Sequence, residues 1–158
     1  MFKALSLAAL ALAAPVLLLR ERGADDDVDK MAREVATKFM SAMKTESIER
    51  VMELVSVPYW EFGVVITDRE VIAENHREVF EKEDLGGVKF ELTAVHAYPE
   101  ARERFSELDR ELLKRVMADG DRVVQFTVEQ DGETNDDFTV FVRLRNGTAS
   151  VAGVEFFR

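Results

Sequence analysis

The chain has 158 residues, of which 47% are hydrophobic, and this length is enough for one domain with its own core. It contains no cysteine, which excludes disulfides, thiolate metal ligands and a cysteine-linked lipid anchor. Its formal net charge of -10 at pH 7 argues against nucleic acid and anionic lipid as partners, because like charges repel. We therefore expect an acidic protein whose residues 25–158 form a single domain.

Residues 1–24 have the composition of an export signal followed by a short linker. Lys3 precedes an uninterrupted apolar run from Ala4 to Leu19, and Ala11-Leu12-Ala13 offers small residues where a signal peptidase reads them. Cleavage after Ala13 would leave an apolar mature end, so an uncleaved signal anchor is the alternative, although ~20 residues are needed to span a bilayer comfortably. The sequence predicts a secreted or periplasmic protein, or one anchored to the membrane only through this N-terminal segment.

The next segment, from Arg20 to Asp29, is predicted to be a charged linker. Asp26 or Asp27 would cap the helix that follows, because a carboxylate accepts hydrogen bonds from the free amides of a first turn. Apolar residues then recur at spacings of three and four. This period predicts helices over Val28 to Lys44 and Glu46 to Val55.

The middle of the chain alternates between strand and helix signals. Val57 to Ile66 is rich in β-formers and contains a glycine, which predicts a hairpin or a bent strand. Thr67-Asp68-Arg69-Glu70 is a capping box that opens a helix to about Lys82. Val88 to Tyr98 predicts a long strand, and Pro99 to Ala118 predicts an amphipathic helix. Strict alternation would place six side chains of the long strand on one face: Val88, Phe90, Leu92, Ala94, His96 and Tyr98.

Residues 121–158 predict three consecutive antiparallel strands. Apolar and polar residues alternate on either side of Asp131-Gly132 and again before Asn146-Gly147. Both dipeptides tolerate the positive φ angles of a two-residue hairpin turn. This meander would be the wall against which the upstream helices pack.

The order of these elements, with Leu54 to Ile66 followed by Asp68-Arg69-Glu70, resembles the nuclear transport factor 2-like superfamily. That group includes polyketide-cyclase-like and ketosteroid-isomerase-like proteins, and the resemblance covers Val28 to Phe157. It implies an α+β fold, in which a curved antiparallel sheet wraps around N-terminal helices as a cone-shaped, cystatin-like roll. It also implies an apolar cavity and a homodimer formed through the sheet. The helix predicted over residues 99–118 departs from the pattern as an extra helix inserted between two strands, where it would cover the cavity mouth or the dimerising face.

The same resemblance implies three polar groups in isomerase members, and this chain has apolar residues at the matching positions. The general base would precede the proline of the first strand, where Val57 stands. The hydroxyl donor of the first helix would fall near Phe39, and the protonated carboxylic acid of the penultimate strand would fall at Val140. An enolate needs a base to form it and donors to stabilise it. We therefore predict that this chemistry is absent and assign no catalytic residue. The sequence has no phosphate-binding glycine loop, nucleophile elbow or zinc motif, so we also predict no cofactor and no metal site.

Four aromatic side chains are the predicted ligand-binding residues: Tyr59, Trp60, His96 and Tyr98. They would stack on a ligand and hydrogen-bond to it in a largely apolar pocket. The alternative is that Trp60 fills the core while His96 and Tyr98 lie half solvated at a strand end. His76 would meet His96 across the cavity in a further hypothesis, as a general base or a weak metal site.

Three functional hypotheses follow. The first is an exported non-catalytic domain that binds a small apolar ligand or a protein partner. The second is an isomerase, dehydratase or cyclase that uses His96, Tyr98 and Tyr59 in a non-standard arrangement. The third is a structural dimerisation module with a filled core.

Overall fold

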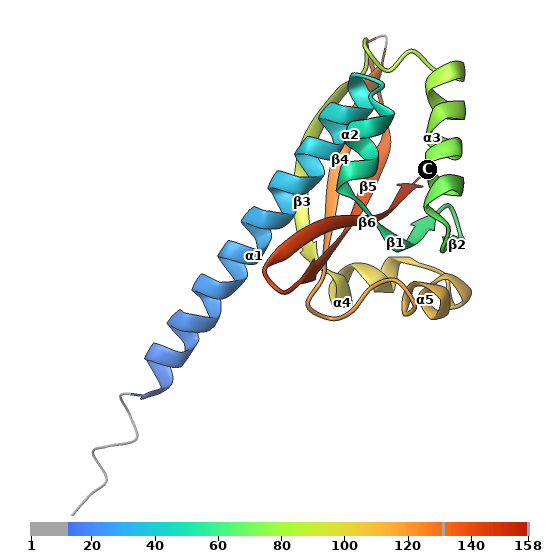
Figure 1. The fold of residues 1–158 in the computed structure, drawn as a ribbon. Coiled ribbons are helices and arrows are strands. Elements are labelled where there is room, and N and C mark those ends of the chain that lie inside the picture. The colour runs from blue at the N-terminus through green and yellow to red at the C-terminus, as the bar shows by residue number, and fades with distance from the viewer. Residues whose placement is uncertain (1–12, 131, 158) are drawn as a thin grey trace, which may run out of the picture.

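A computed structural model describes residues 13–130 and 132–157 of the chain (Figure 1). The predicted export signal lies largely outside these residues, since its first twelve positions are not described. The elements in chain order are α1 (Ala13–Lys44), α2 (Ile48–Leu54), β1 (Val55–Glu61), β2 (Val64–Ile66), α3 (Arg69–Lys82), β3 (Lys89–Ala97), α4 (Tyr98–Ala101), η1 (Arg102–Arg104), α5 (Glu107–Leu113), β4 (Arg122–Gln130), β5 (Glu133–Arg145) and β6 (Thr148–Phe157).

The strands form one six-stranded sheet in the order β2-β1-β6-β5-β4-β3. All neighbours are antiparallel except β1 and β6, which run parallel. The three predicted C-terminal strands are confirmed, and so are their turns, with positive φ at Gly132, Asn146 and Gly147. The mixed α+β architecture and the curved sheet match the fold class predicted from the sequence.

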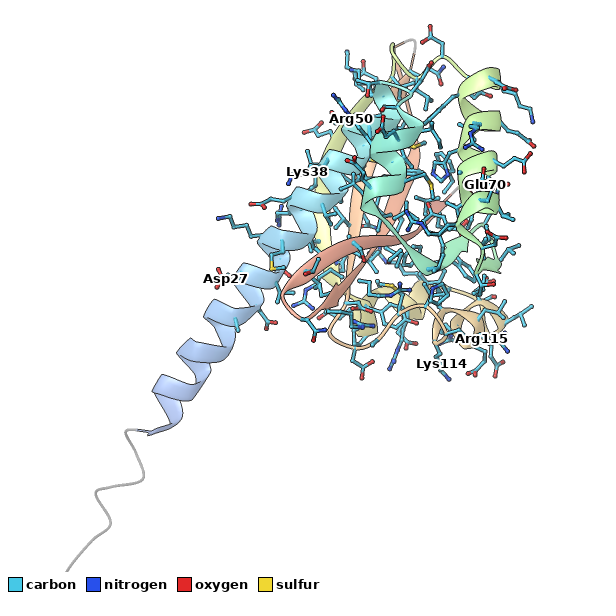
Figure 2. The ribbon with its side chains drawn as sticks, viewed as in Figure 1. Asp27, Lys38, Arg50, Glu70, Lys114 and Arg115 are labelled. Atoms are coloured by element: carbon cyan, nitrogen blue, oxygen red, sulfur yellow. The ribbon has the colours of Figure 1, made fainter. Side chains whose placement is uncertain are left out.

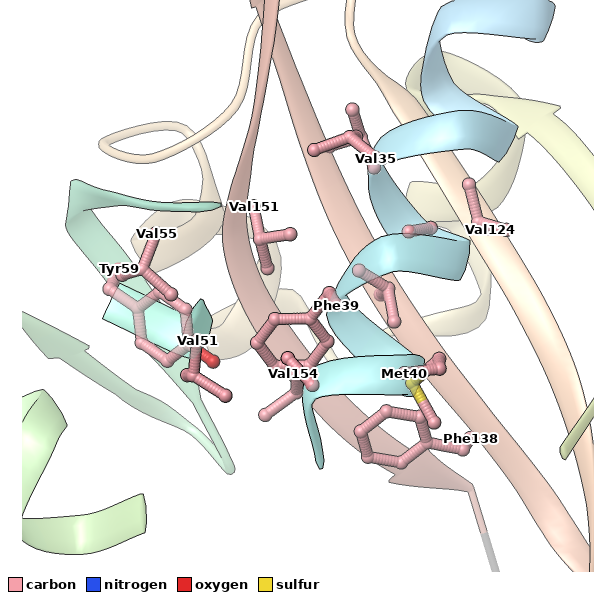
Figure 3. Packing of buried hydrophobic residues seen from close by; sticks show 14 of the residues in the cluster. Val35, Phe39, Met40, Val51, Val55, Tyr59, Val124, Phe138, Val151 and Val154 are labelled. Carbon is pink, nitrogen blue, oxygen red and sulfur yellow. The ribbon is translucent and has the colours of Figure 1, made fainter. Parts of the chain in front are cut away.

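Each face of the sheet has its own hydrophobic cluster. We call the face that packs on α1, α2 and α3 the inner face and the opposite one the outer face. The inner cluster joins Phe39 of α1 and Val51 of α2 to strand residues such as Val154 (Figure 3). The outer cluster joins Trp60 and Phe141 to residues of the segment between β3 and β4. Side chains that alternate along one strand therefore serve two cores.

Helix α1 is longer than predicted, because the expected linker from Arg20 to Asp29 is helical. Asp26 and Asp27 lie inside the helix and do not cap it. Arg122 of β4 stabilises part of the extension, since its guanidinium donates to Asp25 at 2.9 Å and to Asp29 at 2.6 Å. These carboxylates are four residues apart on one side of the helix, and Figure 2 shows Asp27 pointing away from the sheet. Among the described residues, no helix is long and apolar enough to cross a membrane.

Strand β3 does not carry its predicted single face. The pairing of β3 with β4 shifts register between Leu92 and Ala94, which leaves Thr93 as an extra residue in the strand. Phe90 and Leu92 consequently pack on the inner cluster, whereas Tyr98 belongs to the outer one. The prediction that six alternating residues share a face was wrong because one bulge reverses the alternation.

The helix predicted over residues 99–118 is broken into α4, η1 and α5. Ser106 begins α5 as its N-cap, where its hydroxyl accepts from the Asp109 amide at 3.1 Å. The break lets Phe105 and Leu113 both reach the outer cluster, while Lys114 and Arg115 point into solvent (Figure 2). We call residues 98–118 the insertion. It covers the outer face, not the pocket side, at one end of the sheet (Figure 1).

Candidate functional site

An apolar cavity of about 80 Å³ lies between the inner face, α1 and α3. Two methionines of α1, one end of β1, the buried side of α3 and the last residues of β6 form its wall. Its lining residues are Met40, Met43, Glu61, Phe62, His76, Val79, Leu85, Phe90, Phe138, Val154 and Phe156. Only two of these carry a polar side chain, so orientation of a ligand would depend on Glu61 and His76.

His76 reaches the cavity because it lies one turn after Ile72 on the buried face of α3. Its Nδ1 lies 2.9 Å from the Ile72 carbonyl oxygen, and since a carbonyl only accepts, Nδ1 carries the proton. Burial lowers the pKa of His76 from its ordinary value, although that hydrogen bond and the Glu61 carboxylate act in the opposite direction. The ring is therefore neutral near pH 7. The hydrogen bond of the ring to the described residues uses Nδ1, which leaves Nε2 as an acceptor.

Glu61 is the last residue of β1 and shares the inner face with Tyr59, two positions earlier. Asn75 of α3 donates to one carboxylate oxygen of Glu61 at 2.5 Å, which holds the strand end against the helix. Burial first, and then the Glu61 charge, raises the pKa of the Tyr59 phenol. The Tyr59 hydroxyl is buried and has no hydrogen-bond partner in the described part of the chain.

Phenylalanines connect the cavity to the surface. Phe62 and Phe156 stack with ring centroids 5.6 Å apart and planes 9° apart. The ring centroid of Phe156 also lies 4.7 Å from that of Phe138. The Phe138 centroid in turn lies 6.4 Å from that of Phe90. The two outermost rings are about half exposed, at 49% for Phe62 and 47% for Phe156. An aromatic wall thus runs from solvent into the cavity.

The structure does not bring the four predicted ligand-binding residues together. Tyr59 lies on the inner face, where the centroid of its ring is 6.1 Å from that of the His76 ring. Trp60 and Tyr98 are buried in the outer cluster, and the Trp60 indole donates to Glu155 at 2.9 Å. His96 is half-buried and lies 3.0 Å from the Gln125 side-chain oxygen. Its backbone partner is Val123 of the outer cluster, so the hypothesis that His96 meets His76 across the cavity has no support in the geometry.

Sequence reasoning missed Glu61, Phe62 and Phe156 as lining residues. Glu61 had a usable signal, because strand alternation puts it on the same face as Tyr59. Phe62 and Phe156 had none, since they come together only through the parallel pairing of β1 with β6. The described residues contain no group of three or more His, Cys, Asp or Glu side chains that could hold a metal ion.

Comparisons with known proteins identify the fold. No family model matches the chain, and no curated protein matches it. An uncharacterized cystatin-like fold protein from Caulobacter vibrioides is similar over 83% of this chain and 90% of its own, with 16% identity and a TM-score of 0.51. A cystatin-like fold protein of unknown function from Nostoc punctiforme aligns with 80% of this chain and 86% of its own, at 12% identity and a TM-score of 0.50.

A third solved structure, named "Rd1NTF2_04 with long sheet", aligns with 80% of this chain and 99% of its own, at 18% identity and a TM-score of 0.51. At such identities the likeness concerns the backbone arrangement and not the activity. The resemblance inferred from element order is confirmed at that level. The chain has the nuclear transport factor 2-like, cystatin-like fold.

Proposed function

We propose that this chain is an exported, non-catalytic domain that binds a small, mainly apolar ligand in the cavity beneath α3. The observation that carries the proposal is the cavity itself, about 80 Å³ of space lined by methionine, valine, leucine and phenylalanine side chains. Apolar cavities of this kind hold water poorly, because it finds few hydrogen-bond partners there, and they accept small hydrocarbon groups.

The site favours binding over enolate chemistry. Phe39 and Val140, at two of the positions where isomerase members carry polar groups, are fully buried in the inner cluster. Neither side chain can take or give a proton. The third position, Val57, is 37% exposed and equally inert. What the cavity offers is shape, apolar surface and two acceptors.

A cavity-filling substitution tests the proposal. Val79→Phe enlarges a side chain that lines the cavity, whereas Val71→Phe makes the same change on an exposed position of the same helix. We expect benzyl alcohol to bind the wild type and Val71→Phe, and to lose binding in Val79→Phe. Ligand-observed NMR with circular dichroism as a folding check measures this. Equal binding by both variants would contradict the proposed site.

Native mass spectrometry of protein from its own host tests the remaining expectations in one experiment. The intact mass gives the mature N-terminus and hence the fate of the export signal. The assembled mass decides whether the chain is the expected homodimer. Extra mass that disappears on denaturation would identify the occupant. Protein that carries no small molecule but is bound to a second, different polypeptide would favour the protein-partner hypothesis.

A second candidate function is proton-transfer catalysis, which the Nε2 acceptor of His76 favours. A neutral imidazole in an apolar site is a competent general base. The small molecule identified by native mass spectrometry decides whether the chain is an enzyme or a binding protein. Chemical conversion of that molecule by the wild type, abolished in His76→Gln, would establish an enzyme, whereas unchanged occupant would leave the binding proposal standing.

A further inference from the structure

We propose that the cavity selects a ligand that carries a protonated amine on a small apolar body. This inference rests on the proposed function and names the chemistry of its ligand. It starts from the polar atoms of the lining, which come from Glu61 and His76 alone.

Both of these groups are hydrogen-bond acceptors. Asn75 donates to one carboxylate oxygen of Glu61, and this bond leaves the other oxygen as an acceptor. His76 uses its only proton on the Ile72 carbonyl, so its Nε2 presents a lone pair. A ligand that matches this pair must supply donors. An ammonium group supplies three of them and no acceptor.

The charge of the site points the same way. The lining contains one carboxylate and no lysine or arginine. A carboxylate ligand, such as a fatty acid, would face Glu61 without a cation to pair with it, and a like charge in a partly desolvated site is costly. The formal net charge of -10 adds a long-range attraction for cations.

The aromatic wall completes the match. Phe62, Phe138 and Phe156 form a continuous series of rings, with centroids 5.6 Å and 4.7 Å apart, and all three line the cavity beside Glu61. The faces of such rings attract a cation through their quadrupole, and this attraction is larger where water is excluded. A carboxylate, a neutral imidazole and phenylalanine rings together suit an amine better than an alcohol of the same shape.

Matched ligands of three charges test the inference. Benzylammonium, benzyl alcohol and benzoate form one set, and isobutylammonium, isobutanol and isobutyrate form a smaller one. We would titrate each into the full chain at pH 7 and follow the amide resonances of α3 by NMR. We expect each ammonium to bind about tenfold more tightly than its alcohol, because a charged hydrogen bond is the stronger one, and each carboxylate to bind most weakly.

Two variants locate the effect. Glu61→Gln keeps the size of the side chain and its capacity to accept from Asn75, so the alcohol should still bind while the ammonium loses its advantage. Glu91→Gln removes an exposed charge on β3 and should leave the preference unchanged. Val79→Phe should abolish binding of the ammonium as well as of the alcohol.

The outcomes separate this inference from the proposed function. An alcohol that binds as tightly as its ammonium, or a preference that survives in Glu61→Gln, would overturn the amine inference and leave the binding site standing. Ammonium binding that persists in Val79→Phe would show attraction to the acidic surface and would also overturn it. Failure of all six molecules to shift α3 resonances would overturn both.

Discussion

Asp121 shows how single residues hold this fold together. Its carboxylate is fully buried and accepts from the Ala118 amide at 2.7 Å and the Leu144 amide at 2.9 Å. The Arg145 guanidinium donates to both carboxylate oxygens, at 2.5 Å and 3.1 Å. One side chain thus ties the end of the insertion to β5 with every oxygen engaged, as a buried charge requires.

Replacing Asp121 by asparagine should lower the free energy of unfolding by about 2 kcal/mol, because the amide end of asparagine would turn a donor toward donors. Urea denaturation measures the change. Asp119→Asn is the control, since the Asp119 side chain is 82% exposed and its loss should cost less than about 0.5 kcal/mol. Equal effects of the two substitutions would show that the buried hydrogen bonds contribute little.

His76 should make stability depend on pH. Its folded pKa lies below its ordinary value of 6.5 because burial disfavours the charged ring. The unfolded chain therefore binds the additional proton first as pH falls. This contribution to stability is complete above the unfolded pKa and is lost as pH falls below it toward the folded pKa.

We expect the free energy of unfolding to decrease between pH 7 and pH 5.5, a range that lies above the titration of ordinary carboxylates. His76→Gln should flatten that slope, and His96→Gln, on the other face of the sheet, should not. Urea denaturation at a series of pH values measures it. A slope that is the same in wild type and His76→Gln would exclude His76 as its source.

At the scale of elements, local patterns predicted what depends on neighbours in sequence. The three C-terminal strands follow from alternation and from Asp131-Gly132 and Asn146-Gly147. Features set by distant contacts were missed. The bulge at Thr93 is a matter of register with β4, and part of the extension of α1 is stabilised by Arg122, more than ninety residues away. The lining of the candidate site was the least predictable part, because its rim forms where β1 pairs with β6.

Helix α1 offers an element-scale prediction. Its first described turns leave the body of the molecule (Figure 1), and further along the helix Arg122 pairs with Asp25 and Asp29. Arg122→Gln should raise amide hydrogen exchange at residues 25–31 by about tenfold, since it removes charged hydrogen bonds of a partly exposed group. Exchange in β4 and β5 should remain slow, and mass spectrometry of peptides measures both. Unchanged exchange at residues 25–31 would show that helix propensity alone holds the segment.

At the scale of the whole molecule, a single sheet separates two compartments. The inner side carries the cavity, and the outer side carries the insertion packed on Trp60, Phe141 and Ala152. The cavity therefore lies on the opposite side of the sheet from the packing contacts of the insertion. The homodimer expected through the sheet stays a prediction, and such an assembly would have to use outer surface that the insertion leaves free.

The strand order also sets when the molecule can fold. β6 leaves the ribosome after every other described element, yet it is the strand that joins the β1–β2 hairpin to β5. Before it arrives, the chain holds two unconnected pieces of sheet, and the walls of the cavity have not met. Pairings this distant in sequence form slowly, because a long loop must close first. Completion of the sheet, and with it the meeting of the cavity walls, therefore waits for β6.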